Sequence, residues 1–237
     1  MKEIIIAENK KHLKKLIKIE IEQNGNECDL NHIDVSNVKS LNYLFCETKF
    51  NGNISQWNTS KVKKMNGVFA DCPFDGDISL WDTSNVIEMC GLFYKSQFNG
   101  DISKWNVSKV ESMKSMFESA HFNQNIANWD VSNVKFMDLM FLRSLFNQDI
   151  SKWNVSNVID MSRMFDCSPF KGDLTSWTPY SLKNSLHIVD YSYINLPYWA
   201  NIENPEDMIK SINTYQLNKK LNEELNINNN NLQQRKI

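Results

Sequence analysis

Residues 98–120 of this 237-residue chain have the sequence FNGDISKWNVSKVESMKSMFESA, and the same pattern returns every 24 residues on both sides of this stretch. Five consecutive units keep the period without one insertion. A fixed period of this length indicates a stacked repeat protein, because a single unit cannot bury its apolar face by itself. The clearest column is the tryptophan column, which consists of Trp57, Trp81, Trp105, Trp129, Trp153 and Trp177.

Each unit has two halves with different apolar spacing. Around Trp57, apolar or β-branched residues such as Ile54 and Thr59 are spaced as in a short strand. Residues 65–72 instead carry apolar or small side chains at the spacing of one helix face. We therefore expect an α/β repeat solenoid with one short strand and one short helix per 24-residue coil. Equivalent Phe, Trp and Met side chains would stack into a continuous core.

The register of the repeat sets the domain boundaries that we expect. It continues weakly upstream, where Ile33 takes the tryptophan position, and it is lost where Pro179 and Ser185 interrupt two columns. Amphipathic helices are expected over 8–23 and 205–225. The second helix would pack through Met208, Ile212, Tyr215 and Leu225. The expected parts are a strand and helix cap at 1–25, a solenoid of six to seven coils at 26–182, a helical cap at 183–225 and an Asn-rich disordered tail at 226–237.

A known family has a repeat of this kind. The unit quoted above and the stretch LNHIDVSNVKSLNYLF (30–45) resemble the BspA-like leucine-rich-repeat surface proteins, in particular a bacterial surface or lipoprotein repeat of unknown function. The resemblance covers roughly residues 8–182. It implies a right-handed superhelix related to leucine-rich repeats, and the two flanking helices would cap its ends. It also implies roles in adhesion and protein–protein interaction, with no catalytic residues and no cofactor.

Net charge and hydropathy limit which partners and which cellular compartment we expect for this chain. A net charge of −2 gives no basis for binding nucleic acid. No apolar run approaches the roughly 18 residues of a membrane span, so no membrane insertion is expected. The apolar run at residues 4–7 is also too short for a signal peptide. We therefore expect the cytoplasm, or a virion or host cytoplasm, in preference to the cell surface.

Two kinds of polar column are candidates for chemistry. The Asn/Asp columns that include Asp77 and Asp82 present carboxylates in successive coils, and calcium favours such oxygen ligands. Asn and Asp alternate irregularly within these columns, however. We therefore interpret them as side chains that form turns. The serine column that includes Ser60 has no recurring histidine beside it, so we interpret its hydroxyls as bonds to the turn backbone. No catalytic or metal site is therefore predicted.

We expect a partner to bind at positions where the residue type differs from coil to coil. We predict a non-catalytic scaffold that binds an unknown protein or other macromolecule. The alternative is a structural surface or virion component that assembles with itself, although a monomer is the expectation. The candidate partner surface contains Gln56, Leu80, Lys104, Asn128, Lys152, Ile87, Phe136 and Ile159.

Overall fold

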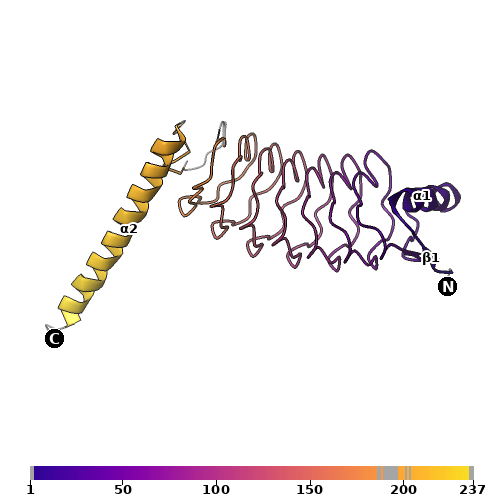
Figure 1. The fold of residues 1–237 in the computed structure, drawn as a ribbon, viewed down its shortest axis with the longest axis horizontal. Helices are drawn as coiled ribbons and strands as arrows, with labels where there is room; N and C mark the ends of the chain where they lie inside the picture. The colour runs from indigo at the N-terminus through magenta and orange to yellow at the C-terminus, as the bar shows by residue number, and fades with distance from the viewer. Residues whose placement is uncertain (1–2, 186–187, 189–196, 201, 203, 235–237) are drawn as a thin grey trace.

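The chain forms a stack of coils with a helix at each end (Figure 1). The computed structural model describes residues 3–185, 188, 197–200, 202 and 204–234. Residues 186–187, 189–196, 201 and 203 of the expected C-terminal cap, and residues 235–237 of the expected tail, lie outside this part. The elements in chain order are β1 (Ile5–Ile6), α1 (Lys10–Asn24), β2 (Ile33–Asp34) and α2 (Pro205–Gln234). The coils between β2 and α2, which we call the coil stack, are joined by parallel contacts between residues 24 apart.

The expected strand and helix within each coil were wrong. Residues 54–59 lie in turns, in which Trp57 N–H donates to the Ile54 carbonyl at 3.2 Å and Val62 N–H donates to the Thr59 carbonyl at 2.8 Å. The parallel bridges lie farther along the coil and are one residue wide, as between Lys64 and Glu88. The two successive turns bury Ile54, Trp57, Thr59 and Val62. Trp57 and Thr59 are two residues apart, and this spacing is why the pattern resembled a strand.

The half of the coil that was expected to be helical bonds to its neighbour instead of to itself. Met65 N–H donates to the Glu88 carbonyl and Phe69 N–H donates to the Leu92 carbonyl, both at 2.9 Å. An α-helix would direct these N–H groups to carbonyls four residues earlier. Here alternate N–H groups join consecutive coils, as in a parallel sheet. The i, i+3, i+4, i+7 spacing therefore arises from two consecutive turns that face the core.

These turns place two residues per coil in the left-handed region. In the turn of residues 89–92 the third residue is Gly91, with φ 58°, and in the turn of residues 93–96 it is Lys95, with φ 53°. A positive φ at the third position is what a type II turn requires. Most of these positions are not glycine: they include Tyr43, Glu47, Asp71, Ser115, Ser119, Leu139, Arg143, Arg163 and Cys167.

The core consists of columns of identical side chains. Phe69 and Phe93 stack with ring centroids 5.7 Å apart, and the next pairs in this column are 5.6 Å apart. The Trp81 indole N–H donates to the main-chain carbonyl of Ile54 in the preceding coil at 3.1 Å. The other five tryptophans of the column make the equivalent bond at the same distance. Each tryptophan therefore buries its ring and also pairs its polar atom.

The N-terminal cap joins the first coil through backbone and side chains. β1 pairs in parallel with β2, with Ile5 opposite Ile33. The Asn9 side chain accepts the His12 N–H at 3.1 Å and caps α1, which ends before Gly25. Leu13 and Ile17 of α1 are buried against the coils. The helix that the sequence predicts over 8–23 thus corresponds to α1.

The C-terminal end differs from the expectation in two respects. Met208 and Ile212 of α2 are buried and Tyr215 stacks on Tyr198 at 4.1 Å, but Leu225 is exposed and does not belong to this packed face. In addition, α2 continues to Gln234, although disorder was expected from residue 226. No proline or glycine interrupts this segment, so each added residue gains one helical hydrogen bond.

The left-handed residues predict which exchanges stabilise the protein. Arg143 is exposed with φ 54°. The free energy of unfolding of Arg143→Gly, measured by urea denaturation, should therefore exceed that of the matched Arg143→Ala by about 1 kcal/mol. Conversely, Gly91→Ala should lose about 1 kcal/mol, because its new Cβ has room, 3.7 Å from the nearest atom, and only the backbone is strained. Equal midpoints for the Arg143 pair would contradict this account.

Candidate functional site

The two Asn/Asp columns form turns, as predicted. In one column, Asp77 Oδ1 accepts the Ser79 N–H at 2.9 Å, and the other members repeat this bond two residues ahead. In the other column, Asn58 Oδ1 accepts both the N–H of Ser60 at 3.2 Å and its hydroxyl at 2.7 Å. The serine hydroxyl therefore bonds a side chain, and the predicted bond to the turn backbone was wrong in that detail.

A third polar column escaped the sequence analysis. Asn51 Oδ1 accepts the N–H of Asp75 in the next coil at 3.0 Å, and Asp75 Oδ1 accepts the Asn99 N–H at 2.9 Å. The ladder continues to the N–H of Lys171. An Asn or Asp directly after each column phenylalanine was the available signal. Within the described ranges, no group of three or more His, Cys, Asp and Glu side chains is placed to hold a metal ion.

The residues before each tryptophan lie at the tip of a turn and face solvent. We call this column the tip column: Gln56, Leu80, Lys104, Asn128, Lys152 and Ser176. Leu80 is 79% exposed, and the other members of its column are polar or charged. The side chains differ in charge and size while the backbone beneath them repeats. The tip column therefore presents varied groups in a fixed register.

The other predicted surface residues lie on a different segment of the coil. Ile87 and Ile159 are half-buried beside the parallel bridges, and Phe136 is 41% exposed within the bridge ladder itself. A turn separates this segment from the tip column in each coil. The eight residues named from the sequence therefore fall on two separate segments of the coil instead of in one patch.

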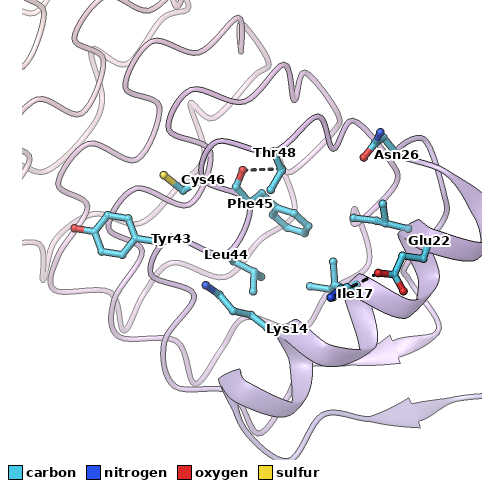
Figure 2. A pocket seen from close by; sticks show the side chains of 11 residues that line it. Lys14, Ile17, Glu22, Asn26, Tyr43, Leu44, Phe45, Cys46 and Thr48 are labelled. Carbon is cyan, nitrogen blue, oxygen red and sulfur yellow. Dashed lines mark hydrogen bonds and ion pairs between the residues drawn. The ribbon is translucent and has the colours of Figure 1, made fainter.

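A cavity of about 540 Å³ lies between α1 and the first coil. Figure 2 shows Lys14 and Ile17 of α1 facing Leu44 and Phe45 of the coil. A cavity of this volume is within the range of small-ligand sites. The sequence could not reveal it, because it depends on how α1 docks.

The side chains that line this cavity are suited to apolar contact with a ligand and not to a chemical reaction. Cys46 lies at its edge, where burial raises the pKa of the thiol and the nearby Glu47 and Asp71 carboxylates raise it further. A raised pKa leaves less of the reactive thiolate at a given pH. At the rim, Lys18 lies 3.7 Å from Glu22, so these two charges offset each other.

Residues 13–121 and 96–192 each match the family described as Mycoplasma protein of unknown function, DUF285. Together the two matches cover more than half of the chain. The chain belongs to this family. Two overlapping matches also identify a repeat protein of unknown function, as the sequence predicted, although the matched family carries a different name from the BspA-like one.

No curated protein and no solved structure matches this DUF285 chain. Its described helices include none that is both long and apolar enough to cross a membrane.

The turn carboxylates predict a loss of stability in acid. The backbone N–H of Ser79 and then its hydroxyl lower the pKa of Asp77, and Asp101 and Asp149 are bonded in the same way. A folded-state pKa below the unfolded one adds stability above the unfolded pKa, near 4, and this stability is lost as pH falls through the folded value. The variant D77N/D101N/D149N should therefore lose less stability between about pH 5 and pH 3 than the wild type in thermal unfolding.

Asparagine already occupies this column at Asn53 and Asn125, so the exchange preserves the turns. The reverse variant, N53D/N125D, serves as the control and should become more sensitive to acid. Parallel pH curves for all three proteins would contradict the assignment.

Proposed function

We propose that this chain is a non-catalytic repeat scaffold that binds another macromolecule through the tip column. The supporting observation is that the recurring side chains are used in the core and in turn ladders, whereas the tip column varies and faces solvent. Solenoid proteins bind partners through such extended columns of variable residues. The chemistry of this column is mixed, with the exposed Leu80 between Gln56 and Lys104, and this suits a protein partner.

The finer features of the proposal come from the resemblance to BspA-like leucine-rich-repeat proteins. We infer a right-handed solenoid of that type and a role in protein–protein interaction of the adhesion kind. The cavity beside α1 adds a place for an apolar side chain of the partner, because Ile17, Leu44 and Phe45 line it. The second candidate, self-assembly, is supported by exposed leucines on α2.

Capture experiments with matched variants test the tip column. The variant L80D/K104E/K152E should lose the partner that the wild-type chain captures, since it removes the exposed leucine and reverses both positive charges of the column. The control K49E/L145D/K171E makes the same three kinds of exchange at exposed positions outside the tip column and should retain the partner. Captured proteins would be identified by mass spectrometry and their affinities measured with purified components. Equal loss in both variants would contradict a role for the tip column.

A further inference from the structure

Helix α2 carries two apolar faces. Met208 and Ile212 are buried, and with Tyr215 they hold the start of the helix against the rest of the chain. Beyond them, three leucines spaced four residues apart are exposed: Leu217 at 59%, Leu221 at 47% and Leu225 at 58%. At 100° per residue, this second face lies about 150° around the helix from the packed one. The leucines therefore cannot pack where the first face does.

The second face lies on the turns of α2 that follow its packed start. Figure 1 shows the helix leaving the last coils and extending away from them. A helix that exposes a row of leucines normally covers them with a partner surface. Because the spacing of four residues keeps the leucines on one narrow face, another helix is the matching shape.

The charges beside the leucines indicate which helix fits. By helical position, Lys220 and Glu224 border the leucine face on one side, and Asn218 and Asn222 border it on the other. In an antiparallel pair of identical helices, equivalent sides face each other, so Lys220 of each copy approaches Glu224 of the other. In a parallel pair, the charged side would face the asparagines. The charges are therefore self-complementary only in the antiparallel arrangement.

We propose that α2 pairs antiparallel with α2 of a second copy of this chain, centred on Leu221. Leu221 then meets its counterpart, and Leu217 meets Leu225 of the other copy. With a rise of about 1.5 Å per residue, Lys220 lies within about 3 Å, along the axis, of the level of the opposing Glu224. The coil stacks extend from opposite ends of the pair, so the tip columns stay accessible. This dimer replaces the monomer that the sequence favours.

Sedimentation equilibrium of the full chain tests the pairing. The wild type should show a concentration-dependent monomer–dimer equilibrium. Leu221→Glu should weaken it by about a hundredfold, because both copies lose a central buried leucine. Leu80→Glu changes a leucine that is more exposed but lies on the coil stack, and it should leave the equilibrium unchanged. A monomeric wild type at all concentrations, or equal effects of the two variants, would overturn the proposal.

Charge exchange tests the orientation. Lys220→Glu gives a chain with two acidic positions on this side, and Glu224→Lys gives a chain with two basic positions. Each variant alone should dimerise more weakly than the wild type, and mixing the two should restore dimers of wild-type affinity. Effects confined within one helix would not recover on mixing. Dimers whose strength is the same alone and mixed would overturn the antiparallel arrangement.

Discussion

In the second half of each coil, every other main-chain N–H donates to a carbonyl of the next coil, as Met65 does to Glu88 and Phe69 does to Leu92. This alternation fixes the length of the coil. One added residue would exchange the N–H groups that face the neighbour for those that do not, and it would turn Met65 and Phe69 away from the core. Hydrogen bonding and packing therefore require the same 24-residue period.

The 24-residue period requires turns whose backbone conformation is strained. Two consecutive turns return the chain toward the core, and their third residues have positive φ even where the side chain is as large as Leu139 or Arg143. Each such residue costs about 1–2 kcal/mol. Burial of the aromatic columns offsets this cost, because successive coils add Phe and Trp rings that are almost fully buried, such as Phe69, Phe74 and Trp81. The indole N–H bonds, at 3.1 Å throughout, allow the tryptophans to be buried without an unpaired donor.

The columns themselves were predictable, because a side chain that recurs every 24 residues can only stack on its own kind. The local conformation was not. Residues 65–72 have the apolar spacing of a helix. The residue types of Ser115 and Leu139 do not predict the left-handed backbone that both adopt. The turn role of Asp77 was predictable from residue type, since Asn and Asp bond the N–H two residues ahead. The cavity beside α1 was not, because no periodicity records how a cap packs on the first coil.

The side-chain ladder that begins at Asn51 has a direction. Each Asn or Asp accepts from the coil that follows it, and the ladder stops at Lys171, whose ammonium group has no acceptor to offer. The ladder therefore has distinct first and last members, while the coils between them are interchangeable in this set of bonds. A tandem duplication of 24 residues in the middle would leave no donor or acceptor of this ladder without its counterpart. Unequal recombination between repeats can thus lengthen or shorten the molecule one coil at a time, with both ends preserved.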